Sequence, residues 1–187
     1  MANTLPKLIA ILGAESTGKT TLAQVLAAHF NSPWVAEYLR DFCNEKNRTP
    51  RRDEQRHIME VQVAREQRAL NFAAAHHAPY VFCDTAPLLT AIYSEYVFAD
   101  TSLYAEANTL HARYPFTIVL TPDIEWVEDG LQRAGEHVRG DIHRLIKHAL
   151  GEINVATVEV SGQGELRTRN AMEGLQNLPV PSSIPSR

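Results

Sequence analysis

Eight consecutive residues near the N-terminus have the types and spacing of a loop that binds phosphate groups. The run Gly13-Ala-Glu-Ser-Thr-Gly18-Lys19-Thr20 matches the pattern GxxxxGK[ST] at every fixed position. In this pattern the glycines let backbone N–H groups turn toward phosphate oxygens, the lysine reaches the terminal phosphates, and the last hydroxyl ligates Mg²⁺. The sequence therefore predicts a nucleoside triphosphate site whose candidate ligands are Gly13, Glu15, Ser16, Thr17, Gly18, Lys19, Thr20 and Thr21.

The segments on either side of this loop support the prediction. An apolar run, Leu8 to Leu12, precedes the loop, and the helix-like segment Thr21 to Phe30 follows it. A helix that begins here directs the positive end of its dipole at the same anion. The alternative, a glycine-rich turn without a ligand, is disfavoured by this context.

A carboxylate closes another apolar run, Tyr80-Val-Phe-Cys-Asp84. In an open parallel sheet the ligand lies beyond the carboxyl ends of the strands, so we expect Asp84 to face the same pocket as Thr20. There Asp84 can hold Mg²⁺ directly or through water. The alternative is that Asp84 or Thr85 caps the helix entered at Pro87, and the two roles are compatible.

Charged residues also close the second expected strand. This strand ends in Val35-Ala-Glu37, and Tyr38-Leu-Arg40 follows. Glu37 is expected on the pocket rim, where a carboxylate can accept the proton of an attacking hydroxyl and Arg40 can pair with it or with substrate. The alternative for Glu37 is a charge that complements the dipole of the next helix. The sequence leaves open whether Glu37 or Asp84 is the base.

Two later segments complete the candidate site. Residues 126–142 are polar and glycine-punctuated, and Arg133 and Arg139 in this segment predict a lid that stabilises the transferring phosphate and excludes water. The alternative is an exposed basic helix face. Ser161 and Gly162 follow the fifth apolar run and can cradle the adenine, although a turn there needs no ligand.

Strand-length apolar runs alternate with helix-compatible segments along the chain. The expected strands are Leu8 to Leu12, Trp34 to Ala36, Tyr80 to Cys83, Thr117 to Leu120 and Val155 to Val160. After the first helix, the expected helices are Arg52 to His77, Pro87 to Phe98, Asp100 to Tyr114, Gly140 to Leu150 and Glu165 to Leu178. This alternation predicts an α/β fold, a parallel sheet with helices on both faces. We expect a single domain over 1–178 and a flexible proline- and serine-rich tail over 179–187.

Composition restricts the partners and the compartment. The 187 residues carry 18 Lys and Arg against 22 Asp and Glu, a net charge of −4, which argues against nucleic acid as an obligatory partner. Cys43 and Cys83 suggest a reducing compartment rather than a disulfide framework. No apolar run approaches the roughly 20 residues that cross a bilayer. We expect a soluble, cytoplasmic protein with a small-molecule partner and no membrane partner, and a homo-oligomer stays open.

Several segments together resemble one known family. They are GAESTGKTTLA, VAEYLRD, DTAPLLTAIYSEYVF, PDIEWVEDG and VSG, and they span roughly Leu8 to Leu178. The chain resembles the ribosylnicotinamide kinase domain of bacterial NadR proteins. The phosphate loop is shared by many enzymes, whereas the EYLR and DT-x-PLLT-x-x-Y segments are more particular. The resemblance implies a P-loop NTPase fold, nucleoside-kinase-like with a lid, and ATP-dependent phosphorylation of the 5′-hydroxyl of nicotinamide riboside in NAD salvage.

The resemblance also implies roles for individual residues. The phosphate loop would hold ATP and Mg²⁺, Glu37 would be the general base, and Asp84 would serve Mg²⁺ or the ribose. An aromatic side chain could stack on the cationic nicotinamide through cation–π attraction, although aromatics in such places are often core residues; the candidates are Trp34, Tyr38, Tyr93 and Trp126. One position departs from the family pattern: Gln132 stands where the family has Arg, and Arg133 is the candidate substitute.

Other protein classes fit the sequence less well. A signalling GTPase is disfavoured because the chain has neither an NKxD segment nor a DxxG segment after the third strand. The phosphate loop alone also fits an AAA family ATPase, but a mechanical one is disfavoured by the lack of a second helical domain. Two alternatives stay open: a kinase for another nucleoside or small hydroxyl compound, and an ATP-binding regulatory module without transfer activity.

Overall fold

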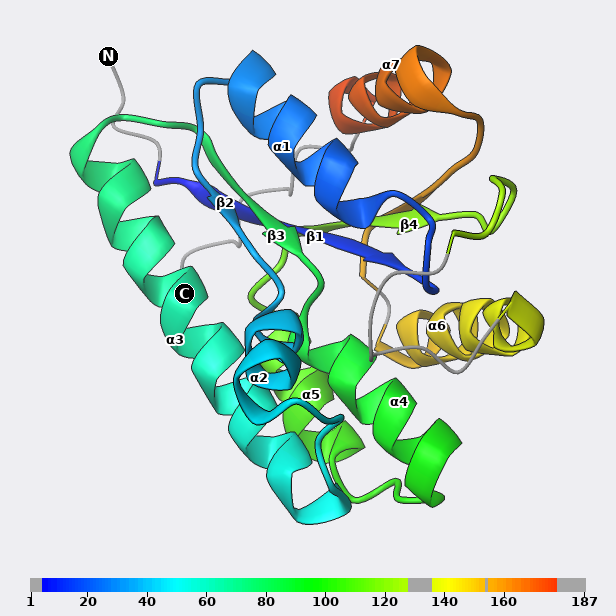
Figure 1. The fold of residues 1–187 in the computed structure, drawn as a ribbon. Coiled ribbons are helices and arrows are strands. Elements are labelled where there is room, and N and C mark those ends of the chain that lie inside the picture. Colours follow the sequence, from blue (N-terminus) through cyan, green and yellow to red (C-terminus); the bar gives the residue numbers. More distant parts are fainter. Residues whose placement is uncertain (1–4, 128–135, 154, 178–187) are drawn as a thin grey trace.

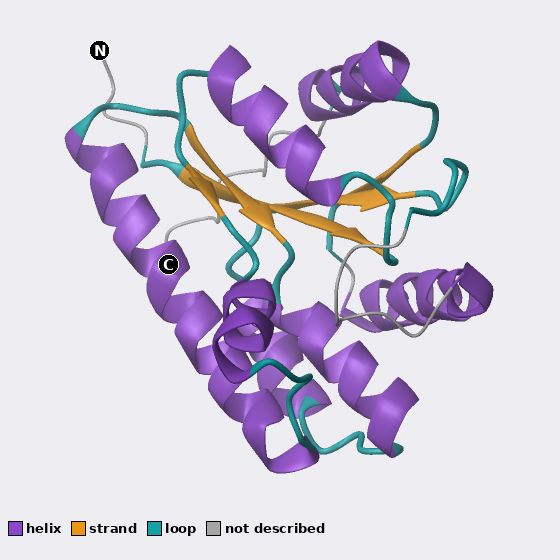
Figure 2. Cartoon of the chain, viewed as in Figure 1, coloured by secondary structure: helices purple, strands orange, loops and turns teal. Residues whose placement is uncertain are grey.

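The computed structural model describes residues 5–127, 136–153 and 155–177. Five parallel strands form one sheet in the order β2-β3-β1-β4-β5, as Figures 1 and 2 show. The strands are β1 (Lys7–Gly13), β2 (Trp34–Val35), β3 (Tyr80–Asp84), β4 (Phe116–Leu120) and β5 (Thr157–Val160). The five-stranded parallel sheet predicted from the alternation of apolar runs is confirmed.

The helices cover both faces of this sheet, also as predicted. They are α1 (Lys19–His29), α2 (Tyr38–Lys46), α3 (Gln55–Ala75), α4 (Pro87–Phe98), α5 (Tyr104–His111), α6 (Arg139–Ile153) and α7 (Gly164–Gln176), with 3-10 turns η1 (Arg52–Glu54) and η3 (Glu136–Val138). In Figure 1, α1 and α7 lie on one face and α3, α4 and α6 lie on the other.

The pleat of β1 divides the core between these two layers. Ile9 and Ile11 pack with α1 and α7, whereas Leu8, Ala10 and Leu12 pack with the helices of the opposite face. A strand buried on both faces needs a continuous apolar run and not an alternating one, which is what β1 has. The connection after β1 leads to β2 on one side of the sheet, whereas the connection after β3 leads to β4 on the other side, so the chain changes direction between β1 and β3. In such sheets the ligand site lies at that point, beyond the carboxyl ends of the strands.

Three elements differ from the sequence-based expectation. The structure places a nine-residue helix, α2, after Glu37, but only Phe42 and Cys43 of this helix are buried, so it has no apolar period that marks its ends. The predicted helix Asp100 to Tyr114 is shorter, because the Asp100 side chain accepts a hydrogen bond from the Ser102 backbone N–H at 3.0 Å and forms a turn before α5. Strand β2 (Trp34–Val35) is shorter than the predicted strand Trp34 to Ala36.

The remaining organisational expectations have different outcomes. None of the helices in the described parts of the chain is both long and apolar enough to span a membrane. Cys43 and Cys83 are both buried free thiols, in agreement with the absence of a disulfide framework. The predicted tail over 179–187 lies outside the described residues.

A buried polar cluster beneath the sheet gives the fold a measurable pH dependence. The Glu66 side chain in α3 is fully buried, and one carboxylate oxygen accepts a hydrogen bond from the Arg113 guanidinium at 3.4 Å. Burial raises the pKa of Glu66 from 4.5 to about 7. Burial also lowers the pKa of His111 from 6.5 to about 4, because the charged imidazolium is disfavoured there.

We expect Glu66→Gln to change the pH dependence of the unfolding free energy. Above pH 4.5 the unfolded chain ionises Glu66 while the folded chain keeps it protonated, so the protein loses stability as the pH rises through about 7. The loss is on the order of 3 kcal/mol, and Gln removes it because an amide does not ionise.

The His111 contribution has the opposite slope below pH 6.5 and is common to the wild type and to Glu66→Gln. Urea unfolding at pH 5 and pH 8 measures the difference, with exposed Glu60→Gln as control. Parallel curves for wild type and Glu66→Gln would contradict this assignment.

Candidate functional site

The predicted phosphate loop connects the end of β1 to the start of α1. Gly18 has φ +81°, a left-handed conformation that glycine adopts without strain. Gly13 is required for a different reason: a Cβ at this position would lie 2.6 Å from Thr17 Oγ1 and 3.1 Å from Leu120 Cβ. The two fixed glycines of the pattern therefore have separate steric roles in shaping this loop.

Side chains of the loop also fold back onto its own backbone. Lys19 Nζ donates to the Ala14 carbonyl at 3.0 Å, and Thr17 Oγ1 donates to the same carbonyl at 2.8 Å. Ser16 Oγ donates to the Val127 carbonyl at 2.6 Å, which joins the loop to the chain beyond β4. These contacts hold the Lys19 ammonium within the loop, where a phosphate-binding lysine must be.

Asp84 lies beside Thr20, as predicted from the direction of the strands. Thr20 Oγ1 donates to Asp84 Oδ2 at 2.5 Å, and the Asp84 side chain is only 1 % exposed. Burial raises the pKa of Asp84, against the lowering effects of Lys19, the Thr20 hydrogen bond and Arg40. The helix α4 has Ala86 as its N-cap and no side-chain capping hydrogen bond, so Asp84 does not cap it.

The pair Thr20 and Asp84 has the chemistry of a Mg²⁺ site. Both supply oxygen, which is the ligand type that Mg²⁺ takes in proteins. Asp84 Oδ1 is buried without a hydrogen-bond partner among the described residues, so it has an oxygen to spare for a cation. Across the same residues, His, Cys, Asp and Glu side chains form no cluster of three or more that could hold a metal. The donor set therefore fits a cation that takes most of its ligands from phosphates and water.

A cavity of about 910 Å³ lies over the phosphate loop. Residues 15–21 of the loop and α1 line one end of this cavity, and Glu37 and Arg40 line it from the start of α2. The structure thus brings Glu37 and Arg40 into one cavity with Lys19 and Thr20, as expected. Glu37 is the N-cap residue of α2, but its side chain makes no capping hydrogen bond.

The far end of this cavity was not found by sequence reasoning. It is formed by side chains from α2, the turn before α3, and α4, namely Leu39, Cys43, Thr49, Pro50, Arg51, Gln55, Leu89, Val97 and Phe98. Arg48 and Arg51 both contact Glu54 in η1, and the Arg48 contact is bidentate at 2.7 and 2.8 Å. These contacts fix the turn that closes this end, and no local sequence pattern marks it.

Of the four aromatic candidates, only Tyr93 lines the cavity. Trp34 packs in the apolar cluster between the sheet and α1, which corrects the expectation that it faces the substrate. The Tyr38 ring lies against Phe42, and the Arg65 guanidinium is 4.7 Å from the centroid of the Tyr38 ring. Tyr38 does not line the cavity, so the structure does not place it as a stacking partner. Trp126 does not line the cavity, although its neighbours Glu125 and Val127 do.

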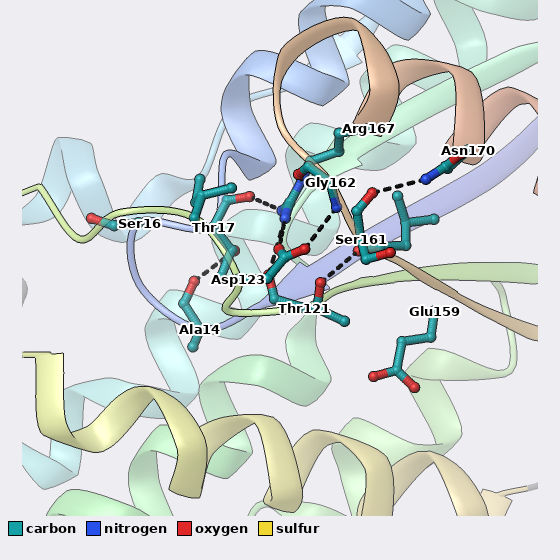
Figure 3. A network of polar contacts seen from close by, with 12 residues as sticks. Ala14, Ser16, Thr17, Thr121, Asp123, Glu159, Ser161, Gly162, Arg167 and Asn170 are labelled. Carbon is teal, nitrogen blue, oxygen red and sulfur yellow. Dashed lines mark hydrogen bonds and ion pairs between the residues drawn. The ribbon is translucent and has the colours of Figure 1, made fainter.

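The predicted adenine residues lie next to a second, smaller cavity of about 320 Å³. Gln163 and Gly164 line it, together with Gly18 and Thr21 of the phosphate loop side, whereas Ser161 and Gly162 do not. The Gly162 N–H donates to Asp123 Oδ2 at 2.7 Å, and the Ser161 carbonyl accepts from Asn170 at 3.0 Å (Figure 3). Ser161 and Gly162 thus shape the turn beside this cavity.

The predicted lid arginines have different outcomes. Arg133 lies outside the described residues, as do residues 128–135 of the lid. Arg139 is buried at the start of α6, where its guanidinium donates to the Ile124 carbonyl from two nitrogens, each at 3.0 Å. One of these nitrogens also lies 3.5 Å from the Ser16 carbonyl of the phosphate loop. The Arg139 guanidinium therefore contacts backbone carbonyls of the phosphate loop and of Ile124.

Sequence reasoning also missed Arg167, a buried arginine of α7. Its guanidinium contacts the phosphate loop, the end of β4 and the turn after β5. Arginine in an amphipathic helix is typical of an exposed face, so the sequence contains no signal for this burial.

Comparisons with known proteins agree with this arrangement. The chain is 28% identical over 164 residues to the trifunctional NAD biosynthesis/regulator protein NadR of Escherichia coli (strain K12), covering 81% of this chain and 37% of that protein. The NadR protein of Salmonella typhimurium matches with the same identity and coverage. The chain thus spans well under half the length of these curated relatives.

Solved structures show the same fold. The crystal structure of NadR protein in complex with NR superposes with a TM-score of 0.80 at 23% identity, covering 93% of this chain and 52% of that one. Deoxyadenosine kinase from M. mycoides with bound dCTP superposes with a TM-score of 0.58 at 12% identity, covering 91% of this chain and all of that one. The P-loop NTPase fold and the resemblance to NadR are therefore confirmed. An AAA domain family matches residues 8–169, most of the chain, and the protein belongs to this family.

Proposed function

We propose that this protein is an ATP-dependent kinase that phosphorylates the 5′-hydroxyl of nicotinamide riboside, giving nicotinamide mononucleotide. The observation that carries the proposal is the shared cavity: the phosphate loop with Lys19 and Thr20 lines it, and so does Glu37. A triphosphate held by the loop and a hydroxyl near Glu37 would be within one enclosure. This is the arrangement that phosphoryl transfer requires, because catalysis rests on positioning and charge stabilisation.

In the proposed reaction, Glu37 accepts the proton of the acceptor hydroxyl. The hydroxyl oxygen bonds to the γ-phosphorus of ATP, the bond from that phosphorus to the ADP oxygen breaks, and ADP leaves. Lys19 and the loop N–H groups offset the charge on the phosphate oxygens. Glu37 is favoured over Asp84 as the base because Glu37 lines the cavity, whereas Asp84 is buried and bonded to Thr20.

Thr20 and Asp84 are the residues that would hold Mg²⁺. When bound, the ion would neutralise charge on the β- and γ-phosphate oxygens. Thr20 Oγ1 lies 2.5 Å from Asp84 Oδ2, so the two side chains that would hold the ion are already adjacent.

The NadR relatives support nicotinamide riboside as the acceptor, since a NadR protein with the same fold was solved with NR bound. The second candidate acceptor is a deoxynucleoside, which the likeness to deoxyadenosine kinase favours. An assay of ADP release with Mg-ATP and each acceptor distinguishes these two. We expect the kcat/KM for nicotinamide riboside to exceed that for deoxyadenosine. A reversed order would overturn the substrate assignment, and ATP binding without acceptor-stimulated ADP release would favour a regulatory module.

Of the four aromatic candidates, Tyr93 is the one that lines this cavity and can contact a cationic base there. We expect Tyr93→Leu to raise the KM for nicotinamide riboside about 3- to 30-fold, because the cation–π attraction of a desolvated ring is lost. The KM for ATP should stay the same. Tyr93→Phe is the matched control, since it keeps the ring. Steady-state kinetics with each substrate varied in turn measures both constants, and equal changes in the two KM values would argue against stacking by Tyr93.

A further inference from the structure

Arg167 joins three segments that surround the phosphate loop. It lies in the first turns of α7 and is only 5 % exposed, although arginine is rarely buried without partners. Its Nε donates to the Gly162 carbonyl at 2.5 Å, one terminal nitrogen donates to the Thr17 carbonyl at 2.5 Å, and the other donates to the Thr121 carbonyl at 3.2 Å. The same nitrogen that contacts Thr121 also pairs with the Asp123 carboxylate (Figure 3).

Asp123 balances the buried charge and holds the guanidinium in place. One carboxylate oxygen pairs with Arg167, and the other accepts the Gly162 N–H at 2.7 Å. Figure 3 shows Arg167 between the phosphate loop on one side and Asp123 and Gly162 on the other. Arginine suits this position better than lysine, because its planar fork can donate to several acceptors in fixed directions at once.

The contact with Thr17 fixes the orientation of a peptide plane in the phosphate loop. In a trans peptide the C=O and the following N–H point to opposite sides, and no peptide bond in the described chain is cis. A Thr17 carbonyl directed at Arg167 therefore sets the Gly18 N–H on the side away from Arg167. Gly18 lines the large cavity. Backbone N–H groups are the donors with which such a loop binds phosphate.

We propose that Arg167 is a positioning residue for triphosphate binding. It holds the Thr17–Gly18 peptide in the orientation that phosphate requires before the ligand arrives, and so reduces the cost of ordering the loop on binding. This inference rests on the proposed function in that it assigns a triphosphate to the loop. It does not depend on the identity of the acceptor or on transfer.

The competing interpretation is that Arg167 only attaches α7 to the sheet. Such a role would lower the melting temperature of a variant but would leave the phosphate affinity of the folded protein unchanged. The test therefore uses inorganic tripolyphosphate, which has no base or sugar and reports on the loop alone. Binding is measured by titration calorimetry at a temperature where circular dichroism shows each variant to be folded.

We expect Arg167→Lys to weaken tripolyphosphate binding tenfold or more and to raise the KM for ATP, while the KM for the acceptor stays the same. Arg169→Lys, an exposed arginine of the same helix, is the matched control and should bind as the wild type does. If folded Arg167→Lys keeps the wild-type affinity, the positioning role is wrong, whatever its melting temperature.

A second variant keeps the proposal testable if Arg167→Lys does not fold. Asp123→Asn keeps Arg167 and retains an oxygen for the Gly162 N–H, but it removes the charge that holds the guanidinium against the Thr17 carbonyl. We expect a several-fold loss of tripolyphosphate affinity, and an unchanged affinity would overturn the proposal. A wild-type protein that binds tripolyphosphate but transfers no phosphate would contradict the proposed kinase function alone.

Discussion

Replacement of Lys19 by Met is expected to lower kcat/KM for ATP by about 10²- to 10³-fold or more, the range found when a single charge-stabilising group is removed from an active site. Met has a similar length and shape but no charge. The Lys19 ammonium lies 3.0 Å from the Ala14 carbonyl of the loop, and Lys19 lines the cavity. Without it, the terminal phosphates lose their main cationic partner within the loop.

The control for this experiment is Lys46→Met, which removes a lysine that lies on the exposed end of α2 and pairs with exposed Glu45 at 3.0 Å. We expect this variant to keep wild-type kinetics, since an exposed pair contributes little. Melting temperatures of both variants should stay close to that of the wild type. Wild-type kcat/KM in Lys19→Met would contradict the assignment of the loop as the triphosphate site.

Replacement of Glu37 by Gln is expected to lower kcat by about 10²- to 10⁴-fold, because general base catalysis contributes an amount of this order. Gln keeps the size and hydrogen-bonding capacity of the side chain but cannot accept the proton. The dissociation constant for ATP should change little, since the proposed role of Glu37 is toward the acceptor hydroxyl and not toward the triphosphate. Steady-state kinetics gives kcat, and calorimetric titration gives the ATP affinity.

Glu45→Gln is the matched control, because Glu45 is an exposed carboxylate of the same helix, α2. It should leave both quantities unchanged. A loss of kcat below about fivefold in Glu37→Gln would exclude Glu37 as the base and would direct attention to Asp84. A parallel loss of ATP affinity would indicate that Glu37 shapes the loop rather than the acceptor site.

Much of the fold was predictable because the strands β1, β3 and β4 are buried on both faces. Continuous apolar runs such as Leu8 to Leu12 are visible in the sequence, and turns with Pro87 or Gly162 separate them from helices. The bounds of α2 were not predictable, because this helix buries only two side chains and owes its position to packing on α3. Strand β2 pairs with β3 at Trp34 and Val35.

The phosphate side of the site was predictable for a local reason. The residues from Gly13 to Thr20 act through their own backbone, so their spacing is enough to specify the loop. Asp84 required one further step, the rule that parallel strands end at the same edge of a sheet. The 2.5 Å contact between Thr20 and Asp84 agrees with that step.

The positions of the aromatic candidates and of Arg167 are set by tertiary packing. Tyr93 and Trp34 are equally plausible stacking partners in the sequence, and only the direction of each side chain separates them: Tyr93 faces the cavity, whereas Trp34 faces α1. Arg167 lies 150 positions from Thr17 in the chain, and no periodicity reveals a contact of that range. Such contacts require the folded structure.

The most direct test of the kinase proposal follows the γ-phosphate itself. Purified protein is incubated with Mg²⁺, ATP labelled in its γ-phosphate and nicotinamide riboside, and the products are separated by chromatography. The predicted result is label in nicotinamide mononucleotide, in equal amount to the ADP formed, with Glu37→Gln giving little of either. Label found only in inorganic phosphate or only in unreacted ATP, under conditions where ATP binds, would contradict the account.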